Sequence, residues 1–304
     1  MFGNERASLR YGTADVSIPR DHRLGELEEP SILRLEFKED PDQHVVLMHV
    51  VVQDADAFFR GVKSKVAESG KRSAFIFVHG YHVSFEDATR RTAQMAYDLG
   101  FEGAPVLYSW PSQGTLAGYT IDESNAEWTQ RNLEDFLLDF AERSGADDIH
   151  LISHSMGGRP LTRAVVALMQ RHPELKRHFS ELILTAPDID AQVFARDIVP
   201  GLLQTGAPIT LYASSEDNAL AASKQVHGYP RAGDSGRGLV VMSGVETVDA
   251  TGMDTGFLKH SYYAETRSVL SDMFYLIHNG ERADQRFGLR GIDSPAGRYW
   301  VFKK

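Results

Sequence analysis

The stretch DDIHLISHSMGGRPL (residues 147–161) decides the fold. Its apolar, strand-like run 149–152 stops at a Ser-His-Ser sequence, two glycines follow, and a helical pattern begins. The pentapeptide SHSMG (residues 153–157) matches the nucleophile-elbow pattern G-x-S-x-G, except that Ser153 stands where the first glycine is usual. The pattern needs small residues on both sides of the central serine, because the turn brings strand and helix close together. Serine is small enough for the first of these positions.

The central serine of this corner, Ser155, is a candidate nucleophile. Ligands of open parallel sheets bind at the carboxyl ends of the strands, and Ser155 follows such an end. The turn would expose the serine Oγ and direct the backbone N–H of Met156 toward a developing oxyanion. The alternative is a serine in an ordinary strand-to-helix turn, since short motifs also occur by chance.

Apolar strand patterns and helical patterns alternate along the chain from residue 73 onward. This alternation predicts a mostly parallel sheet with helices on both faces. The expected strands cover residues 73–80, 104–112, 148–153, 180–190, 207–217 and 238–250. The expected helices cover residues 54–69, 84–100, 122–145, 158–172, 191–206 and 261–280.

The N-terminal part lacks the alternation of strand and helix patterns and consists mainly of strand-like segments. Residues 31–37 and 44–52 are strand-like and are separated by a turn-prone segment, which predicts an antiparallel hairpin on the sheet edge. Another strand-like stretch covers residues 11–18. We expect a single domain over residues 1–304, with an N-terminal extension and edge strands in 1–72 and a catalytic core in 73–290.

Composition excludes several classes of protein. The chain has 304 residues, of which 42% are hydrophobic, and its net charge of −10 argues against broad nucleic-acid binding or docking on anionic membranes. It contains no cysteine, which excludes disulfides, thiolate metal sites and a cysteine nucleophile. The apolar runs are too short to span a bilayer, and the first 30 residues lack the apolar region of a signal peptide. We therefore expect a cytoplasmic protein.

A serine nucleophile needs a base, and nucleophile-elbow hydrolases carry their triad in the chain order serine, acid, histidine. We favour His260, because it lies between the last predicted parallel strand and the last helix, where a loop can reach the serine. The other histidines after the serine have simpler explanations in charged turns, in a polar insertion or at a helix end. They are His172, His178, His227 and His278.

The acid should come from another strand end. Asp217 ends the strand expected at 207–217 and is our first choice, with the adjacent Glu216 as the alternative of a solvated loop residue. Asp188 and Asp190 end the preceding strand and are the other candidates for the acid. Asp190 could instead cap the helix that begins near residue 191.

The second oxyanion donor should come from the loop after the first parallel strand, VHGYHVSFED (residues 78–87). The N–H of Tyr81 is the first candidate and that of His82 the second. His79 and His82 could also be metal ligands, but no acidic or thiolate ligand set accompanies them, and a structural role for His79 is favoured.

Aromatic side chains follow the strand expected at 104–112. Trp110 and Tyr119, together with His82, could wall a pocket for the substrate. Aromatic residues belong to the core equally often.

Several segments together resemble a bacterial alpha/beta-hydrolase family catalogued as domain of unknown function 900. They are FVHGYHVSFEDATRRTAQMAYDLG, SWPSQGTLAGY, HLISHSMGGRPL, LTAPDIDAQVF, TLYASSEDNAL and KHSYY, and the resemblance runs from about residue 11 into the final helix. It implies an alpha/beta-hydrolase fold with little or no cap domain and an esterase-like serine hydrolase with Ser155, Asp217 and His260 at the matching positions. The chain departs from the family at three positions, with His82 and Gly158 where Asn is usual and Lys259 where Gly is usual.

These observations predict cleavage of a small carboxylic ester through an acyl-enzyme, with no cofactor. Transfer of the acyl group to another acceptor would use the same triad. A catalytically silent binding module would keep the fold and a ligand pocket without the reaction.

Overall fold

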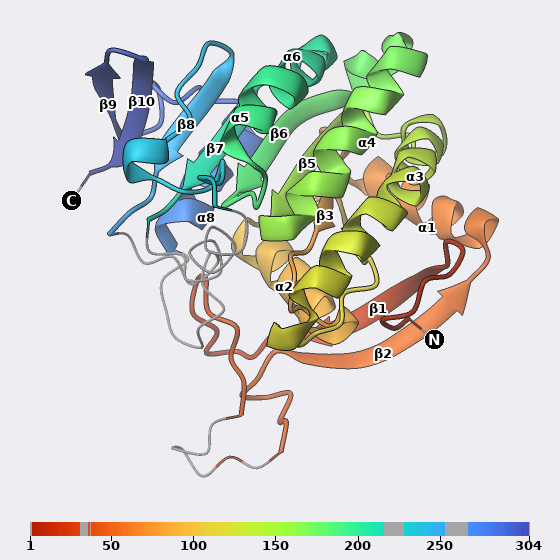
Figure 1. Ribbon diagram of the computed structural model, residues 1–304. Coiled ribbons are helices and arrows are strands. Elements are labelled where there is room, and N and C mark those ends of the chain that lie inside the picture. The colour runs from red at the N-terminus through yellow and green to blue at the C-terminus, as the bar shows by residue number, and fades with distance from the viewer. Residues whose placement is uncertain (1, 31–35, 37, 216–227, 253–266, 304) are drawn as a thin grey trace.

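The computed structural model describes residues 2–30, 36, 38–215, 228–252 and 267–303. Its centre is an eight-stranded sheet in the order β4-β3-β5-β6-β7-β8-β10-β9, parallel except for β9 (Figure 1). The strands are β3 (Ser73–Val78), β4 (Ala104–Tyr108), β5 (Asp148–His154), β6 (Phe179–Thr185), β7 (Ile209–Ala213), β8 (Val245–Asp249), β9 (Leu289–Ser294) and β10 (Gly297–Phe302). The predicted mostly parallel sheet is confirmed.

Helices cover both faces of this sheet. The helices are α1 (Ala55–Glu68), α2 (Phe85–Asp98), α3 (Tyr119–Arg143), α4 (Gly158–Arg171), α5 (Ala191–Val193), α6 (Val199–Leu202) and α8 (Arg267–Phe274). Buried side chains of α1, α3, α4 and α6 form one core cluster, and those of α2 and α8 form the other. Figure 1 shows α3 and α4 in front of the sheet and α8 behind it.

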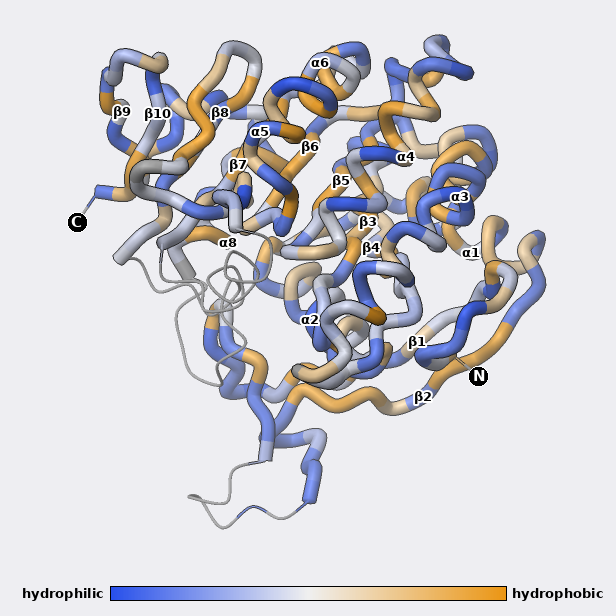
Figure 2. Tube along the Cα trace, viewed as in Figure 1, coloured by the Kyte–Doolittle hydropathy of each residue, from blue (hydrophilic) through white to orange (hydrophobic). Residues whose placement is uncertain are grey.

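The apolar runs of the sequence follow from this burial. In β3, Ala74 and Ile76 pack into one core and Phe75 and Phe77 into the other, because successive side chains of a strand point to opposite faces. A strand covered on both faces is therefore apolar throughout rather than alternating. Figure 2 shows the strands of the main sheet as largely hydrophobic and the outer turns of the helices as largely hydrophilic.

Helix α2 begins where the sequence indicated. The Ser84 Oγ accepts a hydrogen bond from the backbone N–H of Asp87 at 3.1 Å, and the Asp87 carboxylate accepts from the backbone N–H of Ser84 in return. This reciprocal cap satisfies two N–H groups that the first turn leaves without helical partners. It fixes the point at which the loop after β3 turns into the helix.

The N-terminal hairpin is antiparallel as predicted, but its strands differ from those expected. Strand β2 (Val46–Gln53) pairs with β1 (Tyr11–Ser17), and the two form a separate sheet that shares no strand with the main one in the described part of the chain. Of the segment 31–37 that was expected as the partner, residues 31–35 and 37 lie outside the described residues. The small sheet packs against α1 and α3, where the Tyr11 ring contacts Phe58 and Phe136 with centroid distances of 5.1 and 6.4 Å.

The C-terminal strands were not predicted. β9 and β10 form a hairpin that extends the sheet beyond β8, and Trp300 and Phe302 join the same core as α8. The chain between β6 and β7 forms one continuous helical segment over residues 191–205, close to the helix predicted at 191–206, so no lid is inserted there. Among the described residues, no helix has both the length and the apolar character needed to cross a membrane.

Candidate active site

Strand β5 ends in a strained corner at Ser155. The residue has φ 49°, a left-handed conformation that is costly for a residue with a Cβ. A 3₁₀ turn at Ser155–Gly157 then leads directly into α4. The strand, the strained turn and the helix of the nucleophile-elbow pattern are thus all present. Ser155 is 3% exposed, so its side chain is buried and not exposed as the elbow pattern predicted.

Close packing explains why glycine stands at position 157, two residues after the elbow serine. A Cβ on Gly157 would stand 2.3 Å from the carbonyl oxygen of His79 and 2.6 Å from that of Val78. A Cβ on Gly80 would stand 2.9 Å from the Nδ1 of His154 and 3.0 Å from the Cβ of Ser155. The elbow and the loop after β3 therefore touch through two glycines. This contact holds the loop that carries Tyr81 against the elbow.

Position 153, two residues before the elbow serine, also holds a small side chain. Ser153 is buried, and its Oγ lies 3.5 Å from the point where a Cβ on Gly158 would stand. A Cβ on Gly158 would also contact Pro187 at 3.3 Å. Serine fits in place of the first glycine of the pattern, as the sequence suggested.

His79 supports this loop from inside. The structure pairs its Nδ1 with the carbonyl of Gly80 at 2.8 Å, and its Nε2 accepts from the backbone N–H of Trp110 at 3.2 Å. The Trp110 ring stacks on the imidazole at 5.2 Å, and its Nε1–H donates to the His79 carbonyl at 2.7 Å. Burial lowers the pKa of His79 to about 4, which keeps the ring neutral. His79 has the structural role that the sequence favoured, and Trp110, 2% exposed, is part of that support.

The backbone N–H of His82 is directed at a carboxylate. The residue has φ 60°, and its N–H points to the Oδ2 of Asp122 at 3.5 Å, the outer limit of a hydrogen bond. Asp122 also accepts from the Ser112 hydroxyl and the Gln113 N–H, both at 2.7 Å, so it is fixed in place. This leaves Tyr81 as the better candidate for the oxyanion donor. The Tyr81 ring is buried edge-on against Tyr119 at 5.2 Å, so these two aromatic residues lie together beside the loop.

A buried charge cluster lies behind the elbow, and sequence reasoning missed it. The N–H of Asp188 donates to the Ser155 carbonyl at 3.1 Å. Its carboxylate accepts from the Tyr119 hydroxyl at 2.6 Å and from Arg159 at 3.0 Å, and it forms an ion pair with Arg231 at 3.2 Å. Asp188 is 2% exposed and held by two guanidinium groups, so it serves to anchor the elbow.

The other candidate acids and bases occupy different places. Asp190 caps α5 by accepting hydrogen bonds from the N–H groups of residues 192 and 193, as expected for a helix cap. His172 follows the far end of α4, about 20 Å from the elbow at 1.5 Å per helical residue. The imidazole of His178 contacts the Ala146 carbonyl, ahead of the opposite end of β5.

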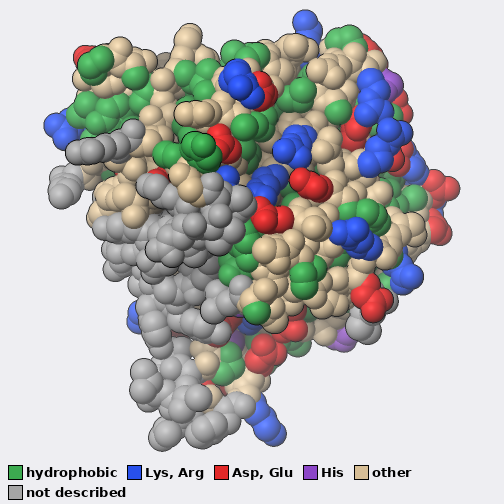
Figure 3. All heavy atoms as spheres, in the orientation of Figure 1, with side chains coloured by type: hydrophobic (Ala, Val, Ile, Leu, Met, Phe, Trp, Pro, Cys, Tyr) green, Lys and Arg blue, Asp and Glu red, His purple; other side chains and the backbone are tan. Residues whose placement is uncertain are grey.

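His278 also has a structural partner, since its Nε2 contacts the carbonyl of Leu99 at 2.7 Å. Asp217 and His260, our first choices for the acid and the base, lie outside the described residues, as do Glu216 and His227. No group of three or more histidine, aspartate or glutamate side chains in the described ranges could hold a metal ion. Acidic and basic side chains are interspersed over α3 and α4 (Figure 3).

The sheet order, the covering helices and the corner at Ser155 define an alpha/beta hydrolase. The family model for an alpha/beta hydrolase of unknown function, DUF900, matches residues 54–279. The chain belongs to this family. A search among curated proteins found no significant match.

Solved structures resemble the chain at low identity. A predicted CIB-like hydrolase from Thermoplasma acidophilum is 15% identical with a TM-score of 0.40, over 69% of this chain and 88% of that one. The carboxylesterase CesB from Bacillus subtilis is 10% identical with a TM-score of 0.36, over 90% and 93%. Esterase B from Lactobacillus rhamnosis is 12% identical with a TM-score of 0.35, over 82% of each chain.

Proposed function

We propose that the protein is a serine hydrolase that cleaves carboxylic esters through an acyl-enzyme. The observation that carries the proposal is the left-handed φ of 49° at Ser155, at the carboxyl end of a central parallel strand. Strain of this kind persists only where the surrounding structure holds it, and it concentrates at functional sites. The buried glycine contacts and the Asp188 anchor supply that support.

In the first half of the reaction, the Ser155 Oγ attacks the ester carbonyl carbon. His260 takes the serine proton and gives it to the leaving alcohol, and Asp217 orients the imidazole and stabilises its cation. The backbone N–H groups of Met156 and Tyr81 hold the oxyanion. Each such donor contributes roughly a hundred- to a thousandfold in rate.

In the second half, water replaces the alcohol. His260 takes a proton from the water, and the resulting hydroxide attacks the acyl carbon. The bond to Ser155 breaks, the serine regains its proton from the imidazolium, and a carboxylic acid leaves. The residues account for every proton, so the reaction needs no cofactor.

The experiment that tests this proposal is hydrolysis of p-nitrophenyl esters of graded acyl length by the wild type and by Ser155→Ala. We expect wild-type turnover and a loss of at least about a thousandfold in the variant. Ser153→Gly is the matched control, because it restores the usual glycine of the elbow pattern and should keep activity. Activity that persists in Ser155→Ala would show that another group is the nucleophile.

Acyl transfer is the second candidate reaction. Adding methanol or a primary amine to the ester assay, with analysis of the products, separates it from hydrolysis. Hydrolysis alone gives free acid as the acyl product. A silent binding module would give no turnover and no reaction of Ser155 with an organophosphonate.

A further inference from the structure

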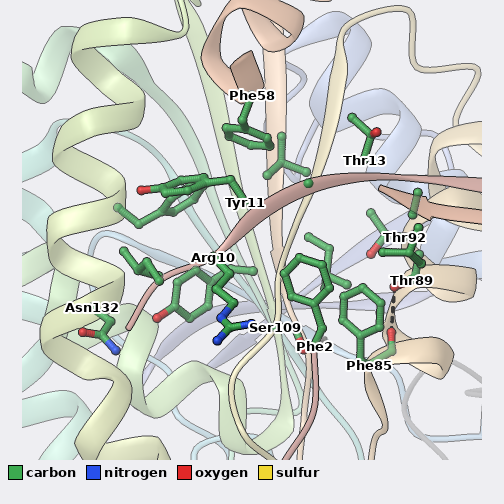
Figure 4. A pocket seen from close by; sticks show the side chains of 18 of the residues that line it. Phe2, Arg10, Tyr11, Thr13, Phe58, Phe85, Thr89, Thr92, Ser109 and Asn132 are labelled. Atoms are coloured by element: carbon green, nitrogen blue, oxygen red, sulfur yellow. Dashed lines mark hydrogen bonds between the residues drawn. The ribbon is translucent and has the colours of Figure 1, made fainter. Parts of the chain in front are cut away.

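A large cavity lies between the small β1–β2 sheet and the edge strand β4 of the main sheet. Its lining residues, between positions 2 and 136, all precede the elbow in the sequence. The cavity volume is about 730 Å³, within the range of roughly 300–1,000 Å³ that is usual for small-molecule sites. Side chains of α1, α2 and α3 complete its walls (Figure 4). Ser155 is not among the described residues that line it. Ser109 is, and its hydroxyl is 3.2 Å from the Nε2 of His79.

The walls of the cavity are mainly apolar. The aromatic side chains that line it are Phe2, Tyr11, Phe58, Phe85, Tyr108, Trp128 and Phe136. Several hydroxyl groups on the walls are already satisfied. Those of Thr89 and Thr92 donate to carbonyls of their own helix at 2.7 Å, and the Tyr108 hydroxyl pairs with the Thr129 hydroxyl at 2.8 Å. These groups offer little to a polar ligand, and the rings favour an apolar one.

Arg10 is the exception to this apolar lining. Figure 4 shows its side chain pointing into the cavity from the residue just before β1. Within the described ranges it forms no hydrogen bond or ion pair. The other charged lining residues, Glu5 and Lys65, have opposite charges, and Lys65 pairs with Glu68 at 3.2 Å. Arg10, which is exposed to solvent, is thus a lining cation that pairs with no carboxylate in the described part of the chain.

We propose that this cavity binds a single-chain fatty acid, with the carboxylate on Arg10 and the aliphatic chain among the rings. A guanidinium group binds a carboxylate through two parallel hydrogen bonds, which a neutral or cationic head group cannot form. Each buried methylene adds apolar contact without the need for a polar partner. The proposal does not depend on the esterase reaction, because the site is separate from Ser155.

The test is calorimetric titration of laurate, below its micelle concentration, into the full-length protein. We expect one laurate per chain and weaker binding of dodecanol and dodecylamine under the same conditions. Arg10→Ala should weaken laurate binding about tenfold to a hundredfold, and Arg10→Lys should weaken it less. Arg20→Ala, which removes an exposed arginine outside the lining, is the matched control and should bind like the wild type.

A second pair of variants tests the place of binding. Gly61 lines the cavity and a Cβ there meets nothing within 4 Å, so Gly61→Leu should reduce the space and weaken binding. Gly70→Leu adds the same side chain outside the lining, also into open space, and should leave binding unchanged. The proposal is overturned by absence of laurate binding, by equal binding in Arg10→Ala, or by binding that Gly61→Leu leaves intact. Loss of binding in Ser155→Ala would overturn it as well, since the laurate would then occupy the site at the elbow.

Discussion

Gly157 lies against the carbonyl oxygen of His79, so closely that a Cβ on the glycine would stand 2.3 Å from that oxygen. The elbow and the loop after β3 are therefore a single packed unit. The strained serine and the Tyr81 backbone are positioned by the same contact. We therefore expect changes at this contact to lower ester turnover.

The first prediction concerns Gly157→Ala. The added methyl group cannot fit without moving the loop, so we expect a loss of about 1–3 kcal/mol in unfolding free energy and a fall of at least tenfold in ester turnover. Chemical denaturation and the p-nitrophenyl ester assay measure the two effects. Gly61→Ala is the control. Gly61 lies in the middle of helix α1 and a Cβ there meets nothing within 4 Å, so this substitution should stabilise the protein slightly. Wild-type activity in Gly157→Ala would show that the close contact is not needed.

The second prediction separates the two aspartates that could serve as the acid. Asp188→Asn removes a buried carboxylate that pairs with Arg231 and with Arg159, although Arg159 keeps its ion pair with Glu123, so we expect a loss of up to about 3–5 kcal/mol in unfolding free energy. Asp217→Asn should lower kcat by about 10⁴ with little change in stability. Denaturation curves and single-turnover rates for both variants provide the comparison. A stable Asp188→Asn that has lost only kcat would move the acid to Asp188.

The third prediction concerns His82. Its φ of 60° suits asparagine better than histidine, and asparagine is usual at this position in the family that the sequence resembles. We expect His82→Asn to keep turnover within about threefold and to raise the unfolding free energy by up to about 1 kcal/mol. His82→Ala should lower it instead. A collapse of the rate in His82→Asn would assign the imidazole a part in the reaction.

The fourth prediction is a pH dependence of stability that originates at His22. Burial opposes its charge, but hydrogen bonds and charges from Asp98 and Glu28, each 2.8 Å away, outweigh it and raise the pKa of His22 from 6.5 to about 9. The folded state thus holds this proton more tightly than the unfolded state. The stabilisation is complete below about pH 6.5 and is lost as the pH rises through about 9.

Allowing for solvent screening, we expect the wild type to lose about 1–2 kcal/mol more between pH 6.5 and pH 9.5 than His22→Gln does. Denaturation by urea at both pH values measures this difference. An equal change in unfolding free energy between the two pH values for both proteins would show that His22 does not carry its charge in the folded state.

The main sheet and the elbow could be predicted because their signals are local. A few consecutive residues are enough to indicate each of three features: strand β5, the small residues around Ser155, and the Ser84 cap of α2. The apolar, non-alternating character of β3 follows from burial on both faces and is visible in the sequence for the same reason.

The remainder depends on contacts between distant segments. Strand β2 pairs with β1, whose Tyr11 packs against α1 and α3, and no local pattern links these distant segments. Strands β9 and β10 contain glycine and charged residues, and they become strands through pairing of β10 with β8 and of β9 with β10. The ion pairs of Asp188 join residues that lie 29 and 43 positions away in the chain, and no local pattern links them.

The measurement that tests the central claim most directly is reaction of the folded protein with a fluorophosphonate, followed by mass spectrometry of its peptides. The account predicts one adduct per chain, on Ser155, that is absent in Ser155→Ala and present in Ser153→Gly. An adduct on another residue, or none in protein that hydrolyses esters, would contradict the assignment of Ser155 as the nucleophile.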